Sequence, residues 1–249
     1  MYIPKDWQRL CAWLKTDLGN YVLYKETISL SQLLNDLFGN NILIIGEPEF
    51  CALTSILQQQ YKNITKFNIH PFVTSDSTTV DAVLINSRQD KLPIDSDSMD
   101  VVILPHSLEI IVNPYEIIRE SYRVLRPEGR IIIIGFAPYG IWHAWKIFAQ
   151  LFNKAPWRNA FIAPKKIIEF LTDLGMEESQ LLKYCCNLPI NSKKFLNKLL
   201  FLESIGNMLP FKTGNIYTIY ACKRVITLTP EFVMQWAQGS LNDDLAKIT

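Results

Sequence analysis

Residues 92–136, with the sequence LPIDSDSMDVVILPHSLEIIVNPYEIIRESYRVLRPEGRIIIIGF, decide the fold of this chain. Met99–Leu104 is a short apolar run between a polar turn and a proline, which is typical of a strand buried on both faces. Pro114 suits the first turn of a helix, and the apolar residues after it recur at helical spacing. Pro127–Gly129 ends that helix, and Arg130–Ile134 reads as a second buried strand. The stretch therefore predicts two parallel strands joined by a crossover helix.

The composition is that of one well-packed domain. The chain has 249 residues, of which 49% are hydrophobic and 20% charged, so it can bury a large core without disulfides or metals. Its formal net charge of +1 argues against a nucleic-acid-binding surface. Five scattered cysteines without C-x-x-C spacing indicate reduced thiols, and charged residues interrupt any signal-peptide core at the N-terminus. We therefore expect a cytoplasmic protein with a small-molecule partner and no transmembrane segment.

Helices and strands alternate on both sides of this stretch. Helices are predicted over residues 6–18, with Gly19 as the C-cap, then over 21–37, 51–61 and 165–174, the last with Gly175 as its C-cap. Strands are predicted over residues 42–45, 65–69, 80–85, 180–186 and 216–223. The last two need no crossover helix of the usual length, so the pattern predicts a doubly wound α/β domain with an antiparallel end strand.

A single domain is expected over residues 1–224. It begins with N-terminal helices over residues 1–38 and contains a helical insertion over 187–214, before the last strand. Residues 225–249 form a C-terminal tail that is polar near its end.

Ligands of doubly wound sheets bind beyond the carboxyl ends of the strands. His106 follows a buried strand there, and a neutral imidazole at this place could act as a general base. The alternative is a histidine that satisfies loop backbone groups. Glu109 is favoured as a helix-start carboxylate over a catalytic one. The three histidines lie far apart in the sequence, so no metal site is predicted.

An ordered set of motifs resembles the class I S-adenosylmethionine-dependent methyltransferases of the type 11 group. Within residues 92–136 these are the L-P-I turn, H-x-L-E, the N-P helix start and R-V-L-x-P-E-G-R. Motifs similar to a little-characterised bacterial branch of that group occur near residues 13–21, 46–49, 104–109, 155–162 and 223–230. The resemblance spans residues 13–230 and implies a Rossmann-like, mostly parallel seven-stranded sheet with an antiparallel last strand.

The resemblance also implies that S-adenosylmethionine is the cofactor. Its contacts would be Gly46, Glu47 and Phe50 at the methionine part, Asn68 at the ribose, Ser87, Arg88 and Gln89 at the adenine, and Pro105 and His106 at the sulfonium, with Leu104 as a further contact. The acceptor pocket would be lined by Trp142, His143, Trp145 and Trp157. Two other readings of these aromatic residues are helix packing against the sheet and docking at a membrane interface.

The sequence departs from the group's usual pattern in three places. The loop Gly46–Phe50 has a single glycine, and Pro48 fixes φ and removes a donor. No acidic residue follows the second strand, although Glu47 or Glu49 could replace it, and Arg88 stands where an aspartate is common. Two functions stay open: methyl transfer to a small or medium acceptor, and a non-catalytic binding or regulatory protein with this fold. A nicotinamide-dependent oxidoreductase is disfavoured because G-x-G-x-x-G is absent.

Overall fold

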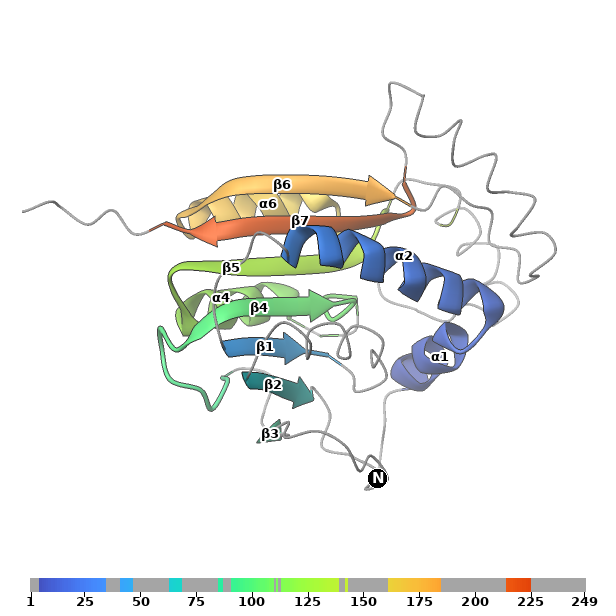
Figure 1. The fold of residues 1–249 in the computed structure, drawn as a ribbon, viewed down its shortest axis with the longest axis horizontal. Coiled ribbons are helices and arrows are strands. Elements are labelled where there is room, and N and C mark those ends of the chain that lie inside the picture. Colours follow the sequence, from blue (N-terminus) through green and yellow to red (C-terminus); the bar gives the residue numbers. More distant parts are fainter. Residues whose placement is uncertain are drawn as a thin grey trace, which may run out of the picture.

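The computed structural model describes residues 5–34, 41–46, 63–68, 85–86, 91–109, 111, 113–138, 142, 161–184 and 214–224. Within them the helices are α1 (Lys5–Leu14), α2 (Asp17–Leu34), α4 (Pro114–Val124) and α6 (Pro164–Asp173). The strands are β1 (Asn41–Ile45), β2 (Asn63–Asn68), β3 (Ile85–Asn86), β4 (Met99–Pro105), β5 (Leu125–Phe136), β6 (Met176–Tyr184) and β7 (Ile216–Lys223). They form one sheet in the order β3-β2-β1-β4-β5-β7-β6 (Figure 1).

The pairing of the strands confirms the predicted fold class. The strands from β3 through β5 pair in parallel, and β7 runs antiparallel to its two neighbours, β5 and β6. The chain builds outward from β1 to β3 and then returns to place β4 on the other side of β1. The order of the strands therefore reverses between β1 and β4, and this point is called the switch point below.

Two hydrophobic cores cover the two faces of the sheet. Successive strand side chains point to opposite faces, so Ile42 and Ile44 pack with residues of α1 and α2, whereas Leu43 and Ile45 pack with residues of α4 and α6. Figure 1 shows α2 in front of the sheet and α4 and α6 behind it. Strands β1, β4 and β7 and residues 131–136 of β5 are thus buried on both faces, as the β-branched run Arg130–Ile134 predicts for its own strand, whereas most described residues of β6 are not buried.

The prediction that Gly19 caps the first helix is wrong. Helix α1 ends at Leu14, and Gly19 lies in the first turn of α2. Thr16 is the N-cap of α2, because its hydroxyl accepts a hydrogen bond from the Gly19 amide at 3.2 Å. A Cβ on Gly19 would overlap the carbonyl oxygens of Trp13 and Leu14. The glycine is therefore needed for the close approach of the two helices.

Other element boundaries shift by a few residues. The helix ends at Val124, before the predicted stop at Pro127–Gly129, because the backbone of Leu125 is extended and Leu125 pairs with Met99 in the sheet. The C-cap role of Gly175 is confirmed, since its φ is +86° and its amide donates to the Thr172 carbonyl at 2.9 Å. The predicted helix over 51–61, residues 187–213 of the predicted helical insertion, strand residues 80–84 and the tail over 225–249 lie outside the described residues. The domain boundaries stay predictions.

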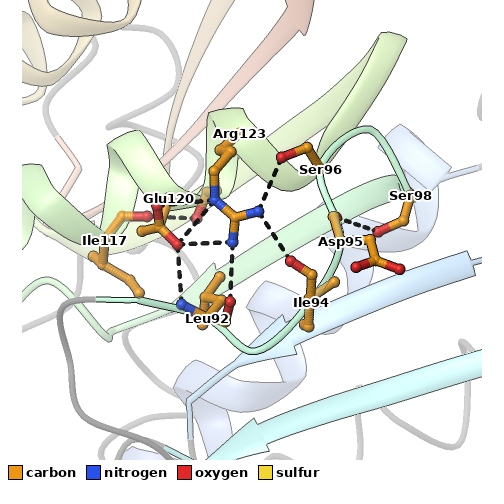
Figure 2. A network of polar contacts seen from close by, with 9 residues as sticks. Leu92, Ile94, Asp95, Ser96, Ser98, Ile117, Glu120 and Arg123 are labelled. Atoms are coloured by element: carbon orange, nitrogen blue, oxygen red, sulfur yellow. Dashed lines mark hydrogen bonds and ion pairs between the residues drawn. The ribbon is translucent and has the colours of Figure 1, made fainter.

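Arg123 of α4 holds the polar turn that precedes β4 (Figure 2). Its guanidinium donates to the Leu92 carbonyl at 3.0 Å and to the Ile94 carbonyl at 2.9 Å. It also pairs with Glu120 at 2.9 Å, and this hydrogen bond lowers the pKa of the Glu120 carboxyl. Glu120 in turn accepts a hydrogen bond from the Leu92 amide at 3.0 Å. The turn and the helix are therefore linked through the planar, forked geometry of the guanidinium.

We expect Arg123→Lys to lower the free energy of unfolding by about 1–3 kcal/mol, because an ammonium cannot reproduce the fork. Urea denaturation measures the loss. Arg119→Lys is the matched control on the same helix, where Arg119 makes an exposed pair with Glu116, and its effect should stay within about 0.5 kcal/mol. Equal losses in both variants would contradict the role given to Arg123.

Gly19→Ala should destabilise the protein by about 1–3 kcal/mol, although alanine is the better helix former. The reason is the contact of the added methyl group with the backbone of Trp13 and Leu14. Asn20→Ala, one residue further along the same helix and exposed, serves as the control and should change stability by less than about 0.5 kcal/mol. Thermal and urea unfolding of the two variants make the comparison. A stabilised Gly19→Ala variant would show that the helices do not meet there.

Candidate functional site

The ends of β1 and β4 touch at the switch point. Gly46 follows β1, and a Cβ on it would lie 3.2 Å from Cγ of Pro105 and 3.3 Å from Oγ of Ser107. The Ser107 hydroxyl donates a hydrogen bond to the Ile45 carbonyl, which ties the two strand ends together. The glycine thus allows the two strand ends to approach closely at the place where ligands of doubly wound sheets bind.

His106 is the next residue after β4, and it is fully buried. Its φ of +51° lies in the left-handed region, and its amide donates to the Ile134 carbonyl at 2.9 Å. Its ring atom Nε2 lies 2.7 Å from Oε1 of Glu26, which comes from α2, and neither side chain is exposed. The ring of Phe136 stacks on the imidazole at a centroid distance of 4.2 Å. Contacts with α2 and with β5 thus hold this loop histidine in place.

Glu109 lies on the other side of the same ring. Its Oε1 is 3.9 Å from His106 Nδ1 and accepts a hydrogen bond from the Phe136 amide at 2.7 Å. The expectation of a helix-start carboxylate is therefore wrong, since α4 begins at Pro114 and Glu109 binds the end of β5 instead. The hydroxyl of Tyr217 comes close to Glu109 beside Gly135. Burial and the charge of Glu109 raise the pKa of Tyr217 well above its usual value.

The two carboxyl groups control the charge of His106. Burial alone would lower the pKa of His106, but Glu26 and Glu109 outweigh it and raise that pKa from 6.5 to about 10. The imidazole is therefore protonated at neutral pH in this arrangement. A general base needs the neutral imidazole, so the predicted catalytic role would require release of the contact with Glu26. That role stays a prediction.

The structure brings several of the predicted site residues together. Leu104 and Pro105 end β4 and His106 follows them, Gly46 follows the neighbouring β1, and Asn68 is the last residue of β2. The remaining predicted cofactor contacts Glu47, Phe50, Ser87, Arg88 and Gln89, and the predicted pocket residues His143, Trp145 and Trp157, lie outside the described residues.

Trp142 is buried in the core of the α1 and α2 face. Its ring meets Trp13 edge-on at a centroid distance of 5.6 Å and lies 5.9 Å from the ring of Phe136. The packing role that the sequence left open thus applies to this residue, and its place in an acceptor pocket stays a prediction. In the described part of the chain, no three His, Cys, Asp or Glu side chains are grouped as metal ligands.

Glu26 is the site residue that the sequence reasoning missed. It lies in the middle of α2, four residues after Val22 and four before Leu30, and both of these are buried. Glu26 therefore occupies the apolar stripe of an amphipathic helix. A charged residue on such a stripe was the available signal, because a buried carboxylate needs a partner.

We expect the free energy of unfolding to decrease as the pH rises from about 6.5 towards 10. The pKa of His106 is higher in the folded state than its ordinary 6.5, so the stabilisation is complete below pH 6.5 and disappears as the imidazole loses its proton. Urea denaturation across this range measures the effect. Glu26→Gln should show a flatter profile, because the amide no longer favours the imidazolium. Parallel profiles for the wild type and the variant would contradict the assignment.

Comparison with known proteins supports the interpretation of the sheet. Residues 50–133 match the type 11 family of the methyltransferase domain. The uncharacterized protein YafS of Escherichia coli (strain K12) is 30% identical over 86 residues, which are 34% of this chain and only 36% of the length of YafS.

Two solved structures have a similar fold. The S-adenosylmethionine-dependent methyltransferase of Thermotoga maritima has a TM-score of 0.60 and 13% identity, covering 88% of this chain and 100% of its own. That of Archaeoglobus fulgidus has a TM-score of 0.56 and 13% identity, covering 81% and 94%. The strand order and the antiparallel β7 together identify the fold of the class I S-adenosylmethionine-dependent methyltransferases, and residues 50–133 are similar to the methyltransferase domain.

Proposed function

We propose that this protein transfers a methyl group from S-adenosylmethionine to a small or medium-sized acceptor. The observation that carries the proposal is the switch point, where Gly46 and Pro105 meet in a sheet of methyltransferase order. A side chain on Gly46 would press against Pro105 and Ser107, and a position without a side chain suits a ligand that approaches the backbone closely. The buried carboxylates of Glu26 and Glu109 beside it suit a ligand that carries positive charge.

The reaction asks mainly for positioning. The bound cofactor supplies a methyl group on a sulfonium, and its transfer in one displacement needs alignment and exclusion of water rather than an acid–base pair. Gly46 and Pro105 border the proposed cofactor site, and His106 is held beside it by Glu26 and Phe136. The further cofactor contacts of this proposal are Glu47, Phe50, Asn68, Ser87, Arg88, Gln89 and Leu104.

For the methyl acceptor we propose only a chemical class. A small molecule is favoured by the near-neutral charge of the chain, and the aromatic residues after β5 are the proposed wall of its pocket: Trp142, His143, Trp145 and Trp157. The reduced cysteines favour the cytoplasm, here of a bacterial cell. Among the described helices none combines the length and the apolar character that crossing a membrane demands.

Isothermal titration calorimetry with S-adenosylmethionine and S-adenosylhomocysteine tests the proposed function. We expect the wild type to bind the cofactor and Gly46→Val to bind it at least about tenfold more weakly, because the side chain would lie against Pro105. Gly175→Ala is the control, since Gly175 precedes β6 at the opposite edge of the sheet, and it should keep the affinity. A folded wild type that binds neither ligand at millimolar concentration would overturn the proposal and favour the non-catalytic alternative.

A further inference from the structure

We propose that Glu26 and Glu109 give the cofactor site a buried negative charge that favours the cationic sulfonium of S-adenosylmethionine over the neutral thioether of S-adenosylhomocysteine. The inference rests on the proposed function, because it concerns the same site. According to this inference, Glu26 of α2 and Glu109 of the loop after β4 discriminate between the substrate form and the product form of the cofactor.

The charge balance of this cluster is the first support. Glu26 is 0% and Glu109 is 3% exposed, and both face the single imidazole of His106. The cluster therefore contains two acidic side chains and only one basic side chain. Among the described residues, His106 is the only ion-pair partner of either carboxylate. Uncompensated charge in a buried place is costly, so a nearby cation would be favoured.

Unused hydrogen-bonding capacity is the second support. Within the described part of the chain, Oε2 of Glu26 and Oε2 of Glu109 are buried and have no hydrogen-bond partner. The fully buried hydroxyl of Tyr217 also lacks one there, and it is aimed at the same cluster. Its oxygen lies 2.5 Å, and Oε1 of Glu109 lies 2.7 Å, from the position that a Cβ on Gly135 would take. Buried polar atoms normally have partners, so several unpartnered atoms in one place indicate a polar or charged ligand.

The place of the cluster in the fold is the third support. His106 directly follows Pro105, which borders the switch point together with Gly46. A charge acts without direct contact: at a distance of about 8 Å and an effective dielectric constant of about 30, one unit charge changes a binding constant about tenfold. The sequence of residues 46–50 has a single glycine, and no acidic residue follows the second strand to bind the ribose. Attraction between the carboxyl groups and the sulfonium would compensate for these weaker contacts with the cofactor.

A comparison of three ligands on the wild-type protein tests the inference directly. Sinefungin carries an ammonium group in place of the sulfonium, whereas S-adenosylhomocysteine is neutral there. We expect calorimetry to show that S-adenosylmethionine and sinefungin bind about tenfold more tightly than S-adenosylhomocysteine. Equal affinities for all three would overturn the inference and leave the proposed function intact. Failure of all three to bind would overturn the proposed function itself.

The double variant Glu26→Gln/Glu109→Gln tests the assignment to these residues. Both glutamine side chains keep an oxygen for the hydrogen bonds from His106 and from the Phe136 amide. Affinity for S-adenosylmethionine should fall about tenfold and affinity for S-adenosylhomocysteine should stay unchanged. Both residues are replaced because a single change lets His106 lose its proton and thereby restores most of the net charge.

The matched control is Glu116→Gln/Glu169→Gln, which removes the same charge from exposed positions on α4 and α6. It should leave the ratio of the two affinities unchanged. An unchanged ratio in the buried double variant would overturn the inference. If the buried variant does not fold, the comparison of the three ligands on the wild type decides.

Discussion

The contact between Glu26 and His106 links the two parts of the molecule that a ligand would meet. It joins α2, near the start of the chain, to the loop after β4, 80 residues later, through a 2.7 Å ion pair with no exposure to solvent. Removal of one partner from such a pair leaves a buried charge without compensation, which is strongly unfavourable. The position of α2 and the protonation of His106 therefore depend on each other.

The sheet explains why this contact lies at a functional edge. Because the chain returns from β3 to the other side of β1, the ends of β1 and β4 meet at the switch point, where ligands of doubly wound sheets bind. Gly46 and Pro105 approach closely there, and Arg123 fixes the turn from which β4 starts. Beside that turn, Lys223 donates to the carbonyls of Tyr122 and Leu125 and so satisfies the end of α4. The framework around the site is thus held at both ends of its strands.

In the proposed cofactor site, the charge of Glu26 and Glu109 takes the role that backbone contacts of a glycine-rich loop usually have. A glycine-rich loop binds its ligand through close approach and amide donors, and the single glycine with Pro48 offers fewer of both. In the proposed site, a pair of buried carboxyl groups around one imidazole would act over a longer distance and favour positive charge instead. The same arrangement keeps His106 protonated, so it favours a role of this histidine in electrostatics over one as a proton acceptor.

Local patterns in the sequence determined the strands, the helix after Pro114, the cap at Gly175 and the class of the fold. The reason is that the periodicity of apolar residues and the residue types of turns and caps depend only on residues close together in the sequence. They also placed Gly46, Pro105 and His106 at one edge of the sheet. Only the tertiary structure decided that Gly19 serves a helix contact rather than a cap, that Leu125 belongs to a strand, and that Glu26 faces His106. Each of these depends on a partner distant in sequence or on the three-dimensional approach of two backbones, and such partners leave no local periodic signal.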